Sequence, residues 1–360
     1  MNYATEFKKF ATSQYIFSAV RITLAIVVPS VIFAYFGILK EFFLFPLATS
    51  FVGLTDQPGP FVRRRNSLIL AIVCFFFVAL IASIIKDYPP LIYVEIVVFG
   101  LFFSIIGVYG QRFAAVGSLS LVVLAIFIDG HLTGTDIIKS SLIFLAGSIC
   151  YLLIFLVVST IQPYKLAGQM IGENYLLLAD YLKIKSKFYL DKPEFPTLYS
   201  EVIAEQIKIK NLQEETRETV FKTRKIVNES TTTSRLLMLM FLNSIDLHEK
   251  LMTSDSDYKK IQESFGDTGF LKTISEYLEK LSAELSNIGI ALQSGTKAKP
   301  ILNIEEELHA VFQDYFDLRN QKMNSDNLEN FMIMRLILVR ITDISEEIKT
   351  IYKVFNQDQK

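Results

Sequence analysis

Three long stretches in the first half of this 360-residue chain hold no charged residue, and they limit the folds open to it. They cover residues 22–39, 66–85 and 140–164. An α-helix rises about 1.5 Å per residue, so roughly twenty apolar residues cross a hydrocarbon layer about 30 Å thick. The stretches therefore predict an all-α, multi-pass membrane protein.

Charged side chains are distributed very unevenly along the chain. Residues 1–165 contain 11 basic and 7 acidic residues, whereas residues 166–360 contain 25 basic and 30 acidic ones. Long helices with so few charges suit a bilayer, and a segment rich in both signs suits water. We therefore expect a transmembrane domain over 1–162 and a cytoplasmic helical domain over 163–360.

About six transmembrane spans account best for the first domain. The strong stretches supply three spans, and weaker apolar segments fill the gaps between them. The predicted spans are 16–38, 41–56, 66–86, 90–109, 112–129 and 138–161. Of these, 41–56 is short, and Pro29 and Pro46 lie inside spans, where proline is expected to free a carbonyl and kink the helix.

The segment from Thr49 to Leu68 is the sharpest break between apolar runs. Pro58, Gly59 and Pro60 cannot continue a helix, so a tight turn is expected there. The three arginines that follow, residues 63–65, favour the cytoplasmic side, because short basic loops resist translocation. This places both termini in the cytoplasm.

The remaining charges agree with that topology. The expected inside set is Lys8, Lys9, Arg63, Arg64, Arg65, Arg112 and Lys165. The expected outside lysines each lie near an acidic residue: Lys40 near Glu41, Lys86 near Asp87 and Lys139 near Asp136.

The second half has the pattern of amphipathic helices. A stripe of Met170, Leu177, Tyr181, Ile184 and Phe188 marks the first helix, which the DKPEFP segment at 191–196 ends. A long helical region over 199–253 has a polar middle at 228–234, where a bend or break is expected. Two further stripes repeat at spacings of three and four, which indicates the core of a bundle of five or six helices or a coiled-coil seam. They are Ile274, Leu278, Leu281, Leu285, Ile288 and Leu292, and Ile337, Ile341, Ile344, Ile348, Ile351 and Phe355.

No motif in the chain indicates an enzyme. A phosphate-binding GxxxxGK[ST] loop and a G-x-S-x-G elbow are both absent, and none of the three histidines has a second ligand at helical spacing. Cys74 and Cys150 lie in apolar runs, where they are expected to be packing residues. We therefore expect no catalytic residue, no metal, no cofactor and no nucleic-acid partner.

Ionisable residues within predicted spans are the candidate transport path, because charges at mid-bilayer are costly and usually face a bundle interior or a water-filled path. They are Arg21, Glu95 and Arg112. Snorkelling to the headgroups is the alternative for Arg21 and Glu95, with a partnered or proton-handling role favoured for Glu95. For the arginines at 63–65, the alternative is that they only contact lipid phosphates and set the topology.

The turn segment adds the motif residues Asp56, Pro58, Gly59, Pro60, Arg63, Arg64, Arg65 and Asn66. Among them Asp56 is expected to be a helix-end or ion-pair residue. Together with the path candidates, this segment predicts a net-positive vestibule for small organic anions, in which Arg21, Arg65 and Arg112 are needed for flux. On the fourth predicted span, Gly100, Ser104 and Gly107 share one face, which suits either packing within the chain or a dimer contact.

The sequence resembles the fusaric acid resistance (FUSC) or aromatic acid exporter family, in particular its FUSC-like inner-membrane branch of the YccS type. The likeness is carried by LTDQPGPFVRRRNSL and by QPYKLAGQMIGENYLLLADYLKIKSKFY after the last span. The matched motif positions are Asp56, Pro58, Gly59, Pro60, Arg65 and Asn66. The resemblance implies a multi-pass protein of the bacterial inner (plasma) membrane that exports aromatic carboxylic acids or similar anions. In outline the chain is also similar to plant malate channels that pair two six-span halves.

Such proteins carry two membrane halves, and this chain has one. We expect either a homodimer or the N-terminal half of a longer product. The first functional hypothesis is therefore efflux of small organic, aromatic anions through a dimeric assembly in the lipid bilayer. The second is a non-transporting, membrane-anchored scaffold or sensor whose helical domain binds a partner.

Overall fold

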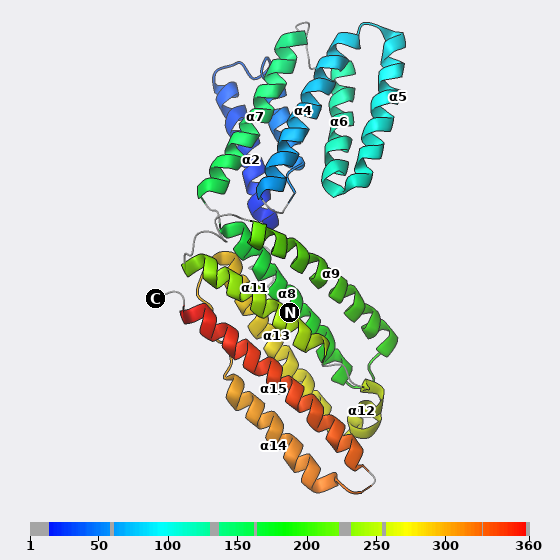
Figure 1. The fold of residues 1–360 in the computed structure, drawn as a ribbon, viewed down its shortest axis with the longest axis vertical. Helices are drawn as coiled ribbons and strands as arrows, with labels where there is room; N and C mark the ends of the chain where they lie inside the picture. Colours follow the sequence, from blue (N-terminus) through cyan, green and yellow to red (C-terminus); the bar gives the residue numbers. More distant parts are fainter. Residues whose placement is uncertain are drawn as a thin grey trace. The chain divides into compact units, whose positions relative to one another are not determined.

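The computed structural model describes residues 14–57, 61–129, 137–161, 164–222, 232–253, 257–325 and 327–357 (Figure 1). The described residues form helices joined by turns and contain no strand. This confirms the predicted all-α class. The chain divides into two compact units that meet between Pro163 and Tyr164, beside the boundary expected from the change in charge.

The first unit, called the membrane unit here, consists of apolar helices that alternate in direction (Figure 1). Helix α3 packs against α2 and α7, α4 packs against α6 and α7, and α5 packs against α6 and α4. In chain order the elements are α2 (Gln14–Tyr35), α3 (Leu44–Leu54), α4 (Phe61–Ile85), α5 (Pro89–Ile106), the 3-10 helix η1 (Gly107–Tyr109), α6 (Gln111–Asp129) and α7 (Ile137–Ile161).

The two ends of the membrane unit differ in charge. One end, called the basic end, holds the α3–α4 connection with the three consecutive arginines and the start of α6 with Arg112. The opposite end holds the α2–α3 and α4–α5 connections and the start of α7. There Lys139 pairs with Glu41 at 3.5 Å, both largely exposed, whereas its expected neighbour Asp136 lies outside the described residues.

Among the residues that the structure describes, five helices, and not six, are long and apolar enough to cross a membrane. The expected span at 41–56 is wrong in length, because α3 has only 11 residues and so rises about 16 Å. Residues 36–43 form turns before it. Pro46 is the third residue of α3, where the missing N–H costs no hydrogen bond, so it produces no kink. Pro29 lies inside α2, as predicted.

Helix α3 is held tightly against α7. A Cβ added to Gly147 would lie 2.2 Å from the carbonyl oxygen of Phe45, so only glycine permits this approach. The Thr49 hydroxyl donates a hydrogen bond to the Gly147 carbonyl at 2.9 Å. This contact fixes the depth of α3 and therefore the position of Asp56, which follows it.

Of the three small residues expected to share one face, Gly107 in η1 packs within the chain, because a Cβ added to it would lie 3.5 Å from Cβ of Ala114 on α6. The other two do not. A Cβ on Gly100 would meet nothing within 4 Å, and Ser104 is exposed. The close contact comes from α6, where a Cβ on Gly117 would lie 2.5 Å from the carbonyl oxygen of Phe103. A dimer contact at Gly100 and Ser104 stays a prediction.

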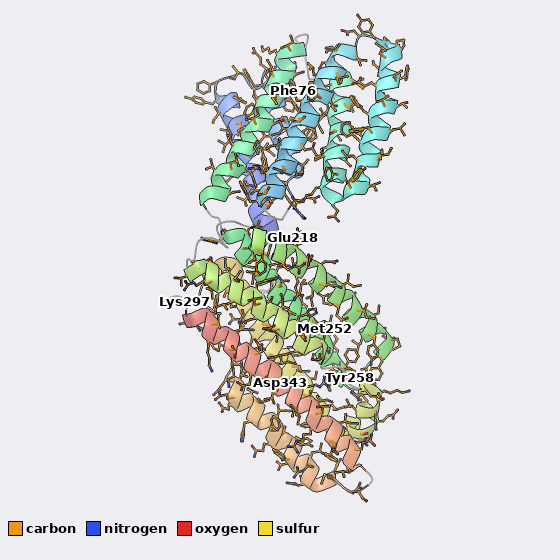
Figure 2. All side chains as sticks on the ribbon, in the orientation of Figure 1. Phe76, Glu218, Met252, Tyr258, Lys297 and Asp343 are labelled. Carbon is orange, nitrogen blue, oxygen red and sulfur yellow. The ribbon has the colours of Figure 1, made fainter. Side chains whose placement is uncertain are left out.

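Side chains on the outside of the membrane unit are largely hydrocarbon (Figure 2). Val97 on α5 and Phe77 on α4 are among many apolar residues with more than half of their surface exposed. In water such a surface would be unfavourable, whereas acyl chains cover it at no cost. The surface chemistry therefore agrees with a membrane location.

The second unit, called the helical domain here, is a bundle around α8. Helix α8 packs against α13, α9 and α11. The elements are α8 (Lys165–Ser186), the 3-10 helix η2 (Lys187–Tyr189), α9 (Phe195–Lys222), α11 (Thr232–Met252), α12 (Tyr258–Phe265), the 3-10 helix η3 (Gly266–Thr268), α13 (Phe270–Ser294), α14 (Ile304–Lys322) and α15 (Leu328–Gln357).

The stripes predicted on α13 and α15 are confirmed as bundle core, since every one of their residues is buried. Helix α8 differs from the expected amphipathic pattern, because its neighbours bury almost every face, including Asn174 and Gln169. The DKPEFP segment ends the first helix as predicted. Most of the polar stretch at 228–234, where a break was expected, lies outside the described residues; α9 ends at Lys222 and α11 begins at Thr232.

Candidate functional site

A buried ion cluster centred on Asp56 is the candidate functional site of the membrane unit. The Asp56 side chain has no exposed surface. Arg64 donates two hydrogen bonds to it, from Nε to Oδ1 and from Nη2 to Oδ2, each 2.8 Å long. The Arg21 guanidinium donates to Oδ2, and the Tyr151 hydroxyl donates to the same oxygen at 3.0 Å. The ion-pair role predicted for Asp56 is therefore confirmed.

Four segments position these groups. Asp56 follows Thr55, the C-cap of α3, and its backbone N–H donates to the Gly53 carbonyl at 3.1 Å. Arg21 lies in the second turn of α2, Arg64 in the first turn of α4 and Tyr151 in the middle of α7. The carboxylate thus ties the first helix of the unit to the last.

Aromatic rings cover the two guanidinium groups. The Phe155 ring centroid lies 4.9 Å from Cζ of Arg64 and 5.9 Å from Cζ of Arg21, and Phe61 stacks on Phe155 at 5.6 Å. The Tyr151 ring also lies 5.9 Å from Cζ of Arg21. Ring faces attract cations, so they stabilise the arginines where water is excluded.

The cluster carries a net positive charge. Two guanidinium groups share one carboxylate, and the side chains of Arg21 and Arg64 are only 7% and 8% exposed. The Nε atom of Arg21 is buried without a hydrogen-bond partner. Arginine is planar and binds carboxylates through paired donors. The arrangement therefore has the donor capacity and the charge to bind one further anion.

Arg21 does not snorkel, because its guanidinium points to Asp56 inside the unit and not to the headgroups. Arg63 is exposed. Arg65 lies at the edge of the cluster and donates to Asn66 Oδ1 at 3.2 and 3.3 Å. The expected turn residues Pro58, Gly59 and Pro60 lie outside the described residues.

Arg112 lies near the motif segment but is not bonded to Asp56. It is half-buried in the first turn of α6. The Gln57 side chain donates to the carbonyl of Gln111 at 3.3 Å, so the residue after Asp56 reaches the start of α6. Arg112 therefore belongs to the same basic end as the cluster.

Comparison with known proteins decides the family. A family model described as FUSC-like inner membrane protein YccS matches residues 67–348. The chain belongs to the FUSC-like inner membrane protein family. It is 21% identical over 315 residues to an uncharacterized protein of Haemophilus influenzae, covering 83% of this chain and 44% of that protein. It is 23% identical over 216 residues to inner membrane protein YccS of Escherichia coli K12, covering 59% of this chain and 30% of that protein.

This FUSC-like chain therefore spans less than half the length of these two relatives. The family match begins at Ser67, directly after the turn segment on which the resemblance was sharpest. Membership of the family thus rests on the residues from α4 onward. The geometry around Asp56 comes from the structure of this chain.

Glu95, the third path candidate of the FUSC-like chain, lies apart from the cluster. It is buried on α5, which packs against α6 and α4, whereas the cluster joins α2, α3, α4 and α7. The three predicted path residues Arg21, Glu95 and Arg112 therefore do not converge at one point.

Sequence reasoning missed Tyr151 and Phe155 altogether, and it favoured Arg65 over Arg64. Tyr151 and Phe155 stand in an uncharged run in which no pattern marks them. Successive helix residues turn by about 100°, so only one of three consecutive arginines can face Asp56. A pairing of Asp56 with Arg21, 35 residues apart, carries no local signal.

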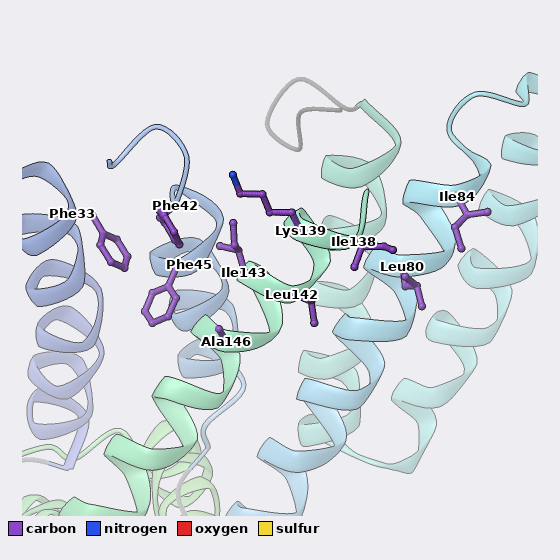
Figure 3. A pocket seen from close by; sticks show the side chains of 10 residues that line it. All are labelled: Phe33, Phe42, Phe45, Leu80, Ile84, Ile138, Lys139, Leu142, Ile143 and Ala146. Atoms are coloured by element: carbon purple, nitrogen blue, oxygen red, sulfur yellow. The ribbon is translucent and has the colours of Figure 1, made fainter. Parts of the chain in front are cut away.

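The opposite end of the FUSC-like membrane unit has an apolar hollow of about 1130 Å³ (Figure 3). Figure 3 shows Lys139 at its rim, above the apolar side chains. The lining residues are Phe33, Phe42, Phe45, Leu80, Ile84, Ile138, Lys139, Leu142, Ile143 and Ala146. Acyl chains of lipid suit such a lining, so we assign it no role in anion binding.

Proposed function

We propose that this chain is an inner-membrane transporter that exports small organic anions, aromatic carboxylates among them, as a dimer. The observation that carries the proposal is the net-positive Arg21–Asp56–Arg64 cluster buried in the membrane unit. Charged side chains within membrane segments are costly and usually serve a substrate or ion pathway.

The chemistry of the cluster fits a carboxylate with an aromatic ring. Arg21 and Arg64 share Asp56, so an arriving carboxylate gives the second guanidinium a partner of its own. The rings of Tyr151 and Phe155 border the same space and offer faces against which an aromatic substrate packs. Asp56 keeps the arginines in place when no substrate is bound.

The charge distribution supports an orientation of the protein in the membrane. With the basic end in the cytoplasm, Arg63, Arg64, Arg65 and Arg112 follow the positive-inside rule. Both termini and the helical domain are then cytoplasmic, and the cluster is reached by anions from the cytosol. This is the orientation that export requires.

The proposal includes a non-enzymatic mechanism without a cofactor. Anion binding and release at the arginines need no covalent step. A second copy of this chain, or the second half of a longer product, would complete an assembly of the size of the relatives, which are more than twice as long as the matched region.

Efflux of hydroxybenzoate from preloaded proteoliposomes tests the proposal. Arg64→Ala is expected to lower the efflux rate roughly tenfold or more, since a loss of about 1.4 kcal/mol changes a rate tenfold. Arg65→Ala is the matched control, because it removes the neighbouring charge while the Arg65 side chain donates to Asn66, whereas Arg64 donates to Asp56. Arg21→Ala is expected to behave like Arg64→Ala.

Equal losses in Arg64→Ala and Arg65→Ala would contradict a role for the cluster and indicate a general effect of surface charge. Unchanged flux in Arg64→Ala, with the variant folded as judged by circular dichroism, would overturn the proposal. Arg64→Lys distinguishes charge from geometry, because lysine keeps the charge and loses the paired donors.

A membrane-anchored scaffold is the second candidate function. It is favoured by an apolar stripe on the outside of α9, where Tyr199, Ile203 and Ile207 are exposed at intervals of four residues. A photocrosslinker at Ile203 in native membranes is expected to capture one defined protein if the scaffold function holds. One at the exposed Lys210 on the same helix provides the control.

A further inference from the structure

Glu95 is an isolated carboxyl group inside the membrane unit. Helix α5 exposes most of its surface, and only Glu95 and Phe103 on it are buried. Glu95 is 5% exposed, and within the described part of the chain neither of its carboxyl oxygens has a hydrogen-bond partner. The cluster around Asp56 does not involve it.

Glu95 lies too deep in the membrane unit for its carboxyl group to reach water readily. Glu95 lies six residues after Pro89, the first residue of α5, or about 9 Å along the helix. A glutamate stem is short, and burial of the side chain shows that it turns inward. Near the same hairpin turn, Ser83 on α4 is also buried, and its hydroxyl likewise has no partner.

The helices that pack against α5 offer no opposite charge at this depth. Contact of Gly117 with Phe103 sets an antiparallel register in which Ala125 of α6 lies level with Glu95. Residues 113–128 of α6 and 66–85 of α4 contain no charged residue. The titratable groups of these two helices are Arg63, Arg64, Arg65 and Cys74 on α4 and Arg112 and Asp129 on α6.

The remaining charges lie at the ends of these helices. Lys86 and Asp87 are in the α4–α5 turn, Asp129 ends α6, and the arginines are at the basic end. On α5 itself the other titratable group is Tyr93, which is 73% exposed. An ionised carboxylate without a partner in such surroundings is strongly unfavourable, and the group neutralises instead.

We infer that Glu95 is a proton-binding site that couples anion export to the proton gradient. The coupling to anion export rests on the proposed function, whereas proton binding at Glu95 does not depend on it. A proton from the side opposite the basic end adds to the carboxylate to give the neutral acid in the conformation described. When the unit rearranges to open Glu95 to the cytosol, the acid releases the same proton, so the exchange balances.

Infrared spectroscopy on the full chain in lipid nanodiscs tests the proton site without any substrate. At neutral pH a carbonyl stretching band of a protonated carboxylic acid is expected, and Glu95→Gln should abolish it. Glu41→Gln is the matched control, since Glu41 is 63% exposed at the same end of the unit and its loss should leave the band. Absence of the band from the native chain at neutral pH would overturn the inference.

Proteoliposomes test the coupling. An inward proton gradient is expected to accelerate hydroxybenzoate export by the native chain and by the Glu41→Gln control, and Glu95→Gln should lose this acceleration. Acceleration by a sodium gradient alone would overturn the proton assignment. Should no anion move in any preparation while the infrared band behaves as expected, the proposed function fails and the proton site stands.

Discussion

Asp56 is the residue on which the membrane unit depends most for its internal charge balance. It accepts hydrogen bonds from two arginines and a tyrosine while having no exposed surface. Removing one member of a buried ion pair costs several kcal/mol, because the remaining charge is left uncompensated. Under the proposed function we therefore expect an incoming carboxylate to share the guanidinium groups with Asp56 and not to replace it.

His248 in the helical domain predicts a pH dependence of stability. It lies on α11 with its ring edge-on to Tyr181 at 6.3 Å, and its Nε2 atom is buried without a partner. Burial lowers the pKa of His248 below its ordinary 6.5. His248 in the unfolded chain thus binds a proton more readily than in the folded one. Its contribution to the free energy of unfolding is therefore fully present above pH 6.5 and declines as the pH falls below that value.

Thermal unfolding of the purified chain between pH 5 and 7.5, followed by circular dichroism, measures this effect. His248→Gln is expected to reduce the slope of stability against pH, by at most about 1.4 kcal/mol per pH unit for one site. His309→Gln is the control, since His309 is exposed on α14. If the stability of the His248→Gln variant changed with pH as steeply as that of the native chain, other groups would be the cause of the acid sensitivity.

At the scale of elements, three helix crossings depend on glycine, one of them the contact of α6 with α5 at Gly117. In the helical domain a Cβ on Gly172 of α8 would lie 2.6 Å from the carbonyl oxygen of Gly289 on α13. In the membrane unit Gly147 has the same role against Phe45. Close approach of the backbones buries the neighbouring side chains, and the α3–α7 crossing sets the position of the helix that ends beside Asp56.

Gly172→Ala is expected to destabilise the helical domain by about 2 kcal/mol, because overpacking in a filled core costs typically 1–3 kcal/mol. Denaturant unfolding followed by circular dichroism gives the value. Gly266→Ala is the control, since the nearest atom to its added Cβ is the Gln262 side-chain oxygen at 3.3 Å, which can move. If the two variants were equally stable, the α8–α13 distance would not be limited by glycine.

At the scale of the whole molecule, we expect the chain to assemble as a homodimer through the outward face of α5. Gly100 leaves open space beside it, and Ser104 is exposed four residues later. Small residues at this spacing let a second helix approach closely in a membrane. A two-fold pair would also approach the length of the relatives, of which this chain covers 44% and 30%.

Light scattering after size-exclusion chromatography in detergent measures the assembly. Gly100→Leu is expected to lower the dimer fraction, because the larger side chain fills the space that a partner helix needs. Ser118→Leu on the exposed side of α6 is the control and should leave it unchanged. A native chain that is monomeric in both detergent and nanodiscs would contradict the dimer.

Local features of the sequence were enough for the fold class and for most helices. Uncharged runs predict membrane helices because hydrocarbon excludes charge, and the stripes of α13 and α15 predict core because helix faces repeat every three to four residues. The sequence marked the segment at 41–56 as short but still predicted a span there. In the structure turns occupy residues 36–43, and α3 begins only at Leu44.

The sequence by itself determined that this protein is a helical membrane protein with three consecutive arginines between apolar helices and a charge-rich helical second half, since hydropathy and helix periodicity act between near neighbours. Only the tertiary structure decided that Arg64 and not Arg65 meets Asp56, that Arg21 and Tyr151 join them, and that Glu95 has no partner. These outcomes depend on the rotation and depth of helices far apart in the chain, which side-chain packing fixes and local sequence does not encode.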